Sequence, residues 1–381
     1  MAEQWARPTF RGLRAVVVNW RDPGHRLAGG SERYAWEMAA ALRDAGASVE
    51  FLTSRDVGQS AREVVEGIRV RRAGGRFTVY PWTLLLMLLR RRRTDLVVDV
   101  ENGIPSFAPL VLRRRTPVVL VMHHVHLDQF GTHFPKPAAV VGRLLERRLM
   151  PLVYRGRQVQ AVSESTREEM VRRLGWAGPI EVVFNGTDLP GPSRGVPEPR
   201  RVAVLGRLVA HKRVELVVEA AAELRDRGEP IGVDIIGRGP REEALGALVA
   251  ARGLTDLVRL RGFVDEPTKA HLLGRAELHV CASEGEGWGL VVLEAAAAGV
   301  PTLAYDVPGL CDSVLADRTG WLLESEEGLA DGIARVLADL DEPGRASAVR
   351  ADCTAWAERF TWDEMRRRSL RVAASVLETA A

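Results

Sequence analysis

The chain has 381 residues, of which 46% are hydrophobic and 27% charged, and this ordinary globular composition excludes a disordered, collagenous or coiled-coil protein. Residues 1–190 carry 29 Arg and Lys against 19 Asp and Glu, whereas residues 191–381 carry 24 against 31. The length and the difference in charge between the halves favour two domains, a basic one followed by an acidic one.

Several protein classes are excluded by what the sequence lacks. The longest strongly apolar run, Trp82–Leu89, is too short to span a bilayer, and no signal-peptide pattern opens the chain. The three cysteines (Cys281, Cys311 and Cys353) have no C-x-x-C or metal-ligand spacing, which argues against a disulfide framework or structural zinc. We therefore expect a cytoplasmic protein. No nucleic-acid-binding module is recognisable, so nucleic acid is not an expected partner.

The first half alternates strand and helix patterns. Near-continuous apolar strands between helices predict a parallel sheet that is covered on both faces. The expected strands are Leu13–Trp20, Val49–Thr53, Ile68–Val70, Asp95–Val100, Val118–Met122, Gln158–Val162 and Ile180–Phe184, and the expected helices are Ser31–Ala45, Leu84–Arg92 and Val140–Tyr154.

The segment Leu189–Arg200 is rich in proline and glycine, which predicts a linker. The alternation then restarts and predicts a second parallel α/β domain, with ligands expected at the carboxyl ends of the strands, in a cleft between the two sheets. The expected strands are Arg201–Leu205, Val233–Ile236, Val258–Leu260, Leu278–Cys281 and Pro301–Tyr305, and the expected helices are Val214–Arg227, Arg241–Arg252, Lys269–Leu273, Leu290–Ala298 and Ser325–Leu340.

The strongest motif is Ser283–Glu294, which reads S-E-G-E-G-W-G-L-V-V-L-E and joins a predicted strand to a predicted helix. A glycine-rich turn at a helix start leaves backbone N–H groups free to bind oxygen atoms. Glu286 and Glu294 are eight residues apart, a little over two helical turns, so both can face one ligand that lies along the helix start. The plain alternative is a helix cap with solvated glutamates.

This motif resembles the E-x7-E motif of family 4 retaining glycosyltransferases, two-domain enzymes of the GT-B fold. Further segments that resemble the family follow in its order, namely Gly29–Glu32, Phe184–Asp188, Val204–Arg213, Ile235–Pro240 and Arg261–Val264. The resemblance implies an α/β protein with two Rossmann-like parallel-sheet domains that face a central cleft. Residues 1–188 would bind the acceptor, residues 189–359 would bind the nucleotide sugar, and residues 360–381 would pack back on the first domain.

The resemblance also implies how the donor is held. Arg207 as a planar fork and Lys212 as a point charge would bind the pyrophosphate and stabilise the departing nucleoside diphosphate. Glu286 would hold the sugar and Glu294 the ribose, while Arg213 stands where the family usually has glycine. The full expected donor-binding set is Gly29, Gly30, Gly206, Arg207, Lys212, Gly237, Arg261, Phe263, Val264, Glu286, Gly287, Trp288, Gly289, Leu290 and Glu294.

Three histidines (His123, His124 and His126) follow the predicted strand Val118–Met122. His123 resembles the family's active-site histidine, with His126 as the substitute. The expected catalytic residues are thus His123, Arg207, Lys212 and Glu286, and the acceptor-binding candidates are Glu101, Asn102, His126 and Asp128. A metal site that includes His133 and plain packing are the alternatives for these histidines.

The resemblance thus implies a retaining transferase that moves a hexose or aminohexose from a nucleoside-diphosphate sugar to a small-molecule, glycan or lipid-linked acceptor. No metal and no cofactor are expected, since the D-x-D at Asp339–Asp341 lies in a late helix. A nucleotide-sugar epimerase, a phosphorylase and a non-catalytic binding protein are the alternatives. The segment Tyr80–Arg93 would allow peripheral membrane contact, although a sheet-covering helix with solvated arginines at its C-terminus is the favoured explanation.

Overall fold

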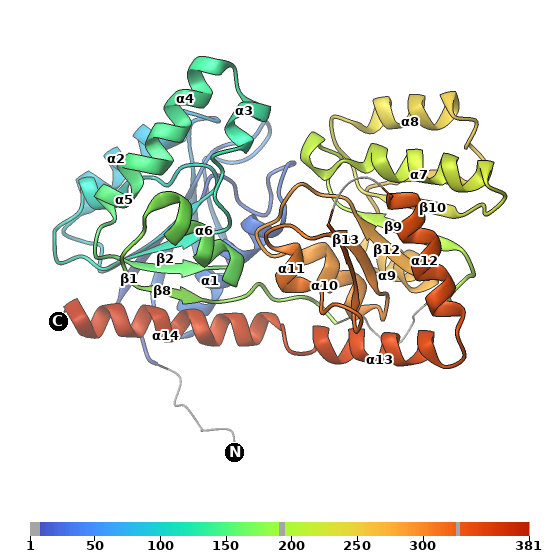
Figure 1. Cartoon of the computed structure of the whole chain (residues 1–381). Helices are drawn as coiled ribbons and strands as arrows, with labels where there is room; N and C mark the ends of the chain where they lie inside the picture. Colours follow the sequence, from blue (N-terminus) through green and yellow to red (C-terminus); the bar gives the residue numbers. More distant parts are fainter. Residues whose placement is uncertain (1–7, 190–194, 325–327, 381) are drawn as a thin grey trace. The chain divides into compact units, whose positions relative to one another are not determined.

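The computed structural model describes residues 8–189, 195–324 and 328–380. The chain forms two compact units, unit 1 with Met1–Gly186 and Trp362–Ala381, and unit 2 with Thr187–Thr361. Each unit is a sheet covered by helices on both faces (Figure 1). The boundaries expected from the sequence, 188/189 and 359/360, each lie two residues from these. Residues 190–194 of the expected linker lie outside the described residues.

The sheet of unit 1 has eight strands in the order β3-β4-β2-β1-β5-β6-β7-β8. Every neighbouring pair is parallel except β3 and β4, which form an antiparallel hairpin. The strands are β1 (Arg14–Val18), β2 (Ser48–Thr53), β3 (Arg62–Val65), β4 (Ile68–Arg72), β5 (Leu96–Glu101), β6 (Val118–Met122), β7 (Gln158–Ala161) and β8 (Ile180–Val182). Because β1 lies between β2 and β5, the strand order reverses at β1, and such a switch point is where open α/β sheets bind ligands.

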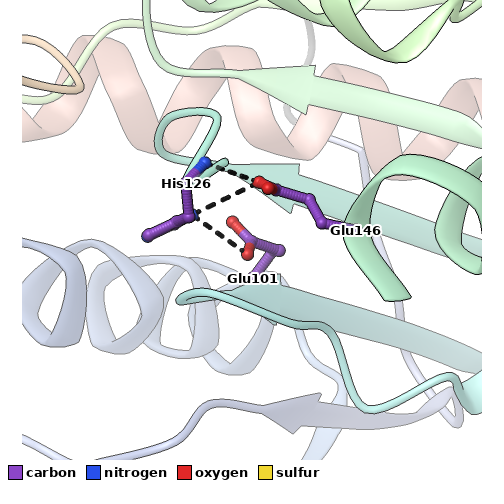
Figure 2. A group of neighbouring side chains, drawn as sticks. All are labelled: Glu101, His126 and Glu146. Atoms are coloured by element: carbon purple, nitrogen blue, oxygen red, sulfur yellow. Dashed lines mark hydrogen bonds and ion pairs between the residues drawn. The ribbon is translucent and has the colours of Figure 1, made fainter. Parts of the chain in front are cut away.

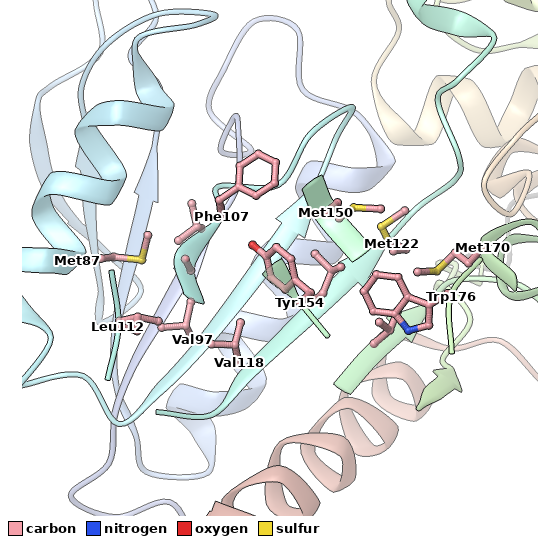
Figure 3. Packing of buried hydrophobic residues seen from close by; sticks show 14 of the residues in the cluster. Met87, Val97, Phe107, Leu112, Val118, Met122, Met150, Tyr154, Met170 and Trp176 are labelled. Carbon is pink, nitrogen blue, oxygen red and sulfur yellow. The ribbon is translucent and has the colours of Figure 1, made fainter. Parts of the chain in front are cut away.

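Helices cover both faces of this sheet. On one face α1 (Gly30–Asp44) packs against α14 (Trp362–Ala380), which also contacts β6 and β7. On the other face α2 (Val79–Arg90), α5 (Met150–Val153) and α6 (Glu164–Leu174) share one buried hydrophobic cluster with the central strands. Figure 3 shows Met87, Tyr154 and Trp176 of this cluster. The shorter elements are η1 (Ala108–Leu110), α3 (Gln129–His133), α4 (Lys136–Leu144) and the π turn η2 (Leu145–Leu149).

The sequence analysis missed the short elements η1 and α3 of unit 1, and it differs from the structure in three longer features. Strand β3 is exposed and charged, so it lacks the apolar pattern of a buried strand. Helix α6 has a polar sequence, and Ser163 caps it by accepting a hydrogen bond from the backbone N–H of Thr166 at 3.1 Å. The helix expected at Val140–Tyr154 begins earlier, at Lys136, and is interrupted by the π turn. Apolar periodicity alone does not reveal an extra residue inside a helical turn.

The sheet of unit 2 has six parallel strands in the order β11-β10-β9-β12-β13-β14. They are β9 (Arg201–Leu205), β10 (Gly232–Ile236), β11 (Val258–Gly262), β12 (Leu278–Cys281), β13 (Thr302–Tyr305) and β14 (Gly320–Leu323). Its helices are η3 (Ala210–Lys212), α7 (Val214–Asp226), α8 (Glu242–Ala251), α9 (Glu266–Arg275), α10 (Leu290–Ala297), α11 (Leu310–Ser313), α12 (Leu329–Asp341) and α13 (Arg345–Ala357). The strand order reverses between β9 and β12, so the segments that follow these two strands meet at the switch point.

Candidate functional site

The loop after β9 carries the two cations expected to hold the pyrophosphate. Arg207 is exposed, and its guanidinium forms no ion pair with any residue that the structure describes. Lys212 ends η3, and Arg213 follows in a left-handed conformation with φ 47°, which explains why glycine would suit that position. The Arg213 side chain donates to the backbone oxygen of Ala282 at 2.9 Å, so it ties the β9 loop to the loop after β12.

Two glycines allow backbone segments of this site to approach closely. A Cβ atom on Gly237 would lie 1.9 Å from the backbone oxygen of Gly206, and the φ of Gly237 is +137°. A Cβ atom on Gly309 would lie 2.2 Å from the backbone oxygen of Glu286. No larger residue fits either position without a shift of the backbone, so these contacts fix the loops at the switch point.

Glu286 is paired with Lys212. The Lys212 ammonium donates to the Glu286 carboxylate, and both side chains are largely shielded, with 15% and 16% of their surface exposed. Burial alone would raise the pKa of Glu286, but the charge and hydrogen bond of Lys212, together with a hydrogen bond from Ser283 and the charge of His211, outweigh burial and lower that pKa. The carboxylate is therefore ionised at neutral pH and lies beside a cation at the start of α10.

Glu294 is paired with a lysine that the sequence analysis did not assign to the site. Lys269 on α9 donates to Glu294 Oε2 at 2.9 Å and also lies 2.8 Å from Glu266. Burial raises the pKa of Glu294, and the Lys269 charge opposes this rise. Lys136, Lys212 and Lys269 are the only lysines in the chain, and two of them pair with the two glutamates of the motif. The rarity of lysine was the signal that could have identified Lys269.

The residues expected beside the base and sugar have different surroundings. The Arg261 Nε atom donates to the buried Asp234 at 2.6 Å. Phe263 is exposed, and Val264 packs partly against a buried cluster of unit 2. The Trp288 ring is buried and lies 5.0 Å from the ring of Phe360, so the indole packs inside unit 2. Gly287, Gly289 and Leu290 lie in the turn that opens α10, where Gly289 is the N-cap with φ 76°.

Gly29 and Gly30 open α1 of unit 1, after the loop that follows β1. The backbone N–H of Gly29 donates to Glu32 Oε2 at 2.7 Å, which is the reciprocal half of a capping box. The other Glu32 oxygen lies 3.2 Å from the Arg21 guanidinium. The expected role of these glycines in donor binding stays a prediction.

His123 lies directly after β6 and is buried. Its ring meets Tyr34 edge-on at 5.3 Å, and its backbone oxygen accepts a hydrogen bond from the Thr166 hydroxyl at 3.0 Å. Burial, with a smaller contribution from His126, lowers the pKa of His123 to about 3, so the ring is neutral at neutral pH. Its Nε2 atom has no hydrogen-bond partner among the described residues.

His126 lies between two buried carboxylates (Figure 2). Its Nδ1 atom is 3.3 Å from Glu101 Oε1 and 3.6 Å from Glu146 Oε1, and its backbone N–H donates to Glu146 at 2.6 Å. Glu101 is completely buried, so it does not present its carboxylate to an acceptor directly. Sequence reasoning missed Glu146, because a glutamate inside a helical pattern reads as a solvent-facing residue.

The remaining acceptor candidates have other partners. The Asn102 side chain donates to Asn19 Oδ1 at 2.5 Å, which joins the ends of β5 and β1. The Asp128 side chain is 81% exposed and forms an ion pair with Arg173 at 2.8 Å. Asn102 therefore lies at the switch point of unit 1, whereas Asp128 lies on a solvent-facing surface.

Among the described residues, Glu101, His126 and Glu146 are the one group of three whose potential metal-ligand atoms lie within 4.8 Å of one another. The side chain of His133 lies outside the described residues. In the D-x-D segment, Asp339 pairs with Arg345 at 2.9 Å and Asp341 with Arg200 at 2.5 Å. None of the described helices combines the length and apolar character that crossing a membrane requires.

Comparisons with known proteins identify the family of this chain. The model of glycosyltransferase family 4 matches residues 28–190, and that of glycosyl transferases group 1 matches residues 192–349. The alpha-D-kanosaminyltransferase of Streptomyces kanamyceticus is 35% identical over 67% of this chain and 72% of the relative. A GDP-mannose-dependent alpha-(1-6)-phosphatidylinositol monomannoside mannosyltransferase of Mycobacterium tuberculosis is 29% identical over 77% of this chain and 82% of its own.

The fold is shared with solved glycosyltransferases as well. Sucrose-phosphate synthase from Thermosynechococcus elongatus superposes with a TM-score of 0.80 and 20% identity, covering 96% of this chain and 100% of that one. Both sheets, their switch points and the motif order fit this architecture. The chain therefore belongs to the family 4 glycosyltransferases and has their GT-B fold.

Proposed function

We propose that this glycosyltransferase moves a hexose or aminohexose, with retention of configuration, from a nucleoside-diphosphate sugar to a small-molecule, glycan or lipid-linked acceptor. The observation that carries the proposal is the arrangement at the switch point of unit 2. There the Lys212–Glu286 and Lys269–Glu294 pairs and the exposed Arg207 come from the segments that follow β9, β11 and β12.

The proposed roles follow from these positions and from the family. Arg207 and Lys212 bind the pyrophosphate and stabilise its charge as it departs. Glu286 and the backbone amides of Gly287–Gly289 bind the sugar, and Glu294 accepts from the ribose hydroxyls. Gly206 and Gly237 have no side chain, so the phosphates can approach the backbone closely there. Arg261–Val264 line the base. One relative is a GDP-mannose-dependent mannosyltransferase and another is a kanosaminyltransferase. GDP-mannose and an amino-sugar donor are therefore both candidates for this chain.

No protein nucleophile is required in this proposal, because the departing phosphate oxygen takes the acceptor proton on the same face of the sugar. The cysteines give no support to a covalent route. Burial raises the pKa of the Cys281 thiol, and burial with nearby aspartates raises that of Cys311 to about 11, so both remain protonated at neutral pH. His123, neutral and buried, contributes its ring and backbone beside the donor sugar.

The proposal also holds that the diphosphate needs no metal ion, since two protein cations take that part. The test combines a thermal-shift panel of UDP-, GDP- and dTDP-sugars with transfer assays. A ligand at 100 times its dissociation constant adds about 2.7 kcal/mol to stability. NMR of the product then reports its anomeric configuration. Stabilisation by a donor without transfer to any acceptor would favour a binding protein, and product formation without an acceptor would favour an epimerase.

We further propose that unit 1 contacts an anionic membrane surface from the cytoplasmic side, which would suit a lipid-linked acceptor. Large apolar side chains are exposed on α2 and along α4 and α5, and of these helices α2 and α5 share the buried cluster on one face of the sheet (Figure 1). The rings of Phe77 and Phe134, just before α2 and α4, lie 6.2 Å apart and join the two helices at one surface. The exposed apolar residues are Phe77, Leu85, Leu88, Leu89, Val140, Val141, Leu144 and Leu152.

The charges on these helices have one sign. No acidic residue occurs between Glu66 and Asp95, and the only one between Asp128 and Glu164 is the buried Glu146. Exposed arginines follow α2 at 91–93, lie in η2 at 147 and 148 and follow α5 at 155, and three more lie before β6 at 113–115. Apolar insertion combined with arginines over anionic headgroups is the pattern of a peripheral membrane surface, at about 1 kcal/mol per basic residue.

Vesicle sedimentation tests this surface. The protein should sediment with vesicles that contain phosphatidylglycerol, and not with phosphatidylcholine alone. Val141→Asp combined with Leu144→Asp should abolish sedimentation, whereas Val57→Asp, at an exposed apolar residue outside these helices, should not. Equal sedimentation of the double variant and the wild type would show that this surface is not the membrane contact.

A further inference from the structure

Three elements of unit 1 bring the side chains of Glu101, His126 and Glu146 together at the carboxyl edge of its sheet (Figure 2). Glu101 ends β5, His126 lies in the loop after β6, and Glu146 is the second residue of the π turn η2. The side chains of both glutamates are completely buried, and that of His126 is 13% exposed. Within the described residues, neither Glu101 oxygen nor Glu146 Oε2 accepts a hydrogen bond.

Stability does not explain this cluster. Removing charged groups from water costs several kcal/mol per ion, and apolar side chains of similar volume are often as stabilising as a buried ion pair. Each unpaired polar atom adds a desolvation cost of about 1–3 kcal/mol. The cluster also lies at the carboxyl edge of a parallel sheet, where ligands of such folds bind. A role in the reaction is the better explanation.

The π turn is an independent sign of function. Such turns are rare, arise as single extra residues within α-helices, and occur frequently at functional sites. Here the turn interrupts the helical segment Lys136–Val153, and Glu146 within it faces the interior while Arg147 and Arg148 are exposed. The distortion therefore coincides with the one residue of this segment that reaches His126.

The histidine segment is held at both of its ends. The Thr166 hydroxyl donates to the backbone oxygen of His123, and Glu146 accepts from the backbone N–H of His126. Between them, the His124 ring lies against the His126 ring, with the two ring planes tilted by 34° and the centroids 3.8 Å apart. The placement of the His126 ring and backbone thus sets the path of the chain from His123 to His126.

We propose that Glu101 and Glu146 are positioning residues, which grip His126 from two sides and thereby fix the segment 123–126 that presents His123 to the reacting substrates. The effect on the reaction rests on the function proposed above, while the grip itself does not. Glu101 acts through His126 rather than on the acceptor, because no part of its side chain reaches the surface.

The charges that face His126 favour its imidazolium form. Burial alone would lower its pKa, but the Glu101 and Glu146 carboxylates raise the pKa of His126 to about 10. His123 and His124 are its neighbours on the same segment. On α2, burial and the charge of Glu101 raise the pKa of Tyr80. A positively charged ring between two carboxylates is a tighter grip than a neutral ring would be.

Steady-state kinetics test the role in the reaction. Glu101→Gln and Glu146→Gln should each lower kcat for transfer about 10- to 100-fold, with the affinity for free nucleoside diphosphate unchanged, because the nucleotide residues belong to unit 2. The matched control is Glu50→Gln, another buried carboxylate of unit 1, which pairs with Arg90 and should leave kcat unaltered.

Replacement by aspartate separates charge from shape. Glu101→Asp shortens the side chain but keeps its charge, so it should retain more transfer than the isosteric Glu101→Gln. If Glu101→Gln retained more transfer than Glu101→Asp, Glu101 would only fill space, and the proposal would be overturned. A loss of nucleotide affinity as large as the loss of transfer would overturn it as well.

The protonation of His126 tests the grip without an assay of transfer. In 13C- and 15N-histidine-labelled wild-type protein, the ring assigned through His126→Gln should remain imidazolium at pH 8 and should become neutral there in Glu101→Gln. A neutral ring at pH 8 in the wild type would overturn the grip, as would one equivalent of tightly bound Zn²⁺ or Mn²⁺ that His126→Gln removes. An inactive wild type with a charged His126 would refute the proposed function and leave the grip intact.

Discussion

Lys269→Met should weaken the binding of free nucleoside diphosphate. Lys269 Nζ lies 2.9 Å from Glu294 Oε2, and 19% and 23% of the two side chains remain exposed. A hydrogen bond to a charged group contributes about 1.5–3 kcal/mol. Since this pair is partly solvated, we expect about 1–2 kcal/mol, which corresponds to an increase of about 5- to 30-fold in Kd.

The mechanism of this loss predicts a dependence on pH. Burial already raises the pKa of Glu294, and removal of Lys269 takes away the main effect that opposes this rise. A protonated Glu294 accepts ribose hydroxyls poorly. The defect of Lys269→Met should therefore be largest at low pH and should diminish as the pH rises above the pKa of Glu294.

Calorimetry with free nucleotide, from pH 6 to pH 9, measures the effect. Lys269→Arg should bind nearly as tightly as the wild type. Glu266→Gln is the matched control, because Glu266 also contacts Lys269 but its side chain is 73% exposed. Equal affinity of Lys269→Met and the wild type would refute the reasoning, and tighter binding would show that Lys269 competes with ribose for Glu294.

The remaining predictions concern the same unit. Arg207→Ala and Lys212→Ala should each lower turnover about 10²-fold or more in a folded protein, and wild-type turnover in either would remove the pyrophosphate role. Transfer should persist in EDTA; a loss that Mg²⁺ or Mn²⁺ restores would contradict the assignment of the phosphate charge to protein cations. Glu294→Gln should weaken free nucleotide more than Glu286→Gln, which should mainly slow transfer. Gly237→Ala should destabilise unit 2 by more than about 2 kcal/mol in urea unfolding, because its Cβ would lie 1.9 Å from a backbone oxygen.

The sequence was sufficient to predict the two parallel α/β domains, because buried parallel strands have long apolar runs that are visible without a structure. It was also sufficient for the motif at Glu286 and Glu294, whose glycines and acids are contiguous. The sequence analysis did not predict Lys269 and Glu146 as site residues, because each contacts a partner that lies on a different element of the fold. Residue spacing carries no information on which side chains from different crossovers converge.

The burial of ionisable groups was also not predictable from the sequence. Glu101 follows an apolar strand and was expected to contact an acceptor, yet it is completely enclosed. The sequence placed Glu101 correctly at a strand end, but the burial of its carboxylate depends on the loop after β6 and on the π turn. Both features arise from packing between elements, which a pattern along one strand does not encode.

The return of the last helix to unit 1 has a consequence for biosynthesis. Helix α14 packs against α1, where Arg366 donates to Glu37 at 2.6 Å, and against β7, where Gln160 donates to Ser369 at 2.9 Å. On the ribosome, unit 2 is complete before α14 emerges, whereas unit 1 remains incomplete until α14 has been made. Nascent chains that end before Trp362 would leave the α1 face of unit 1 uncovered, so the first domain is completed only after the second.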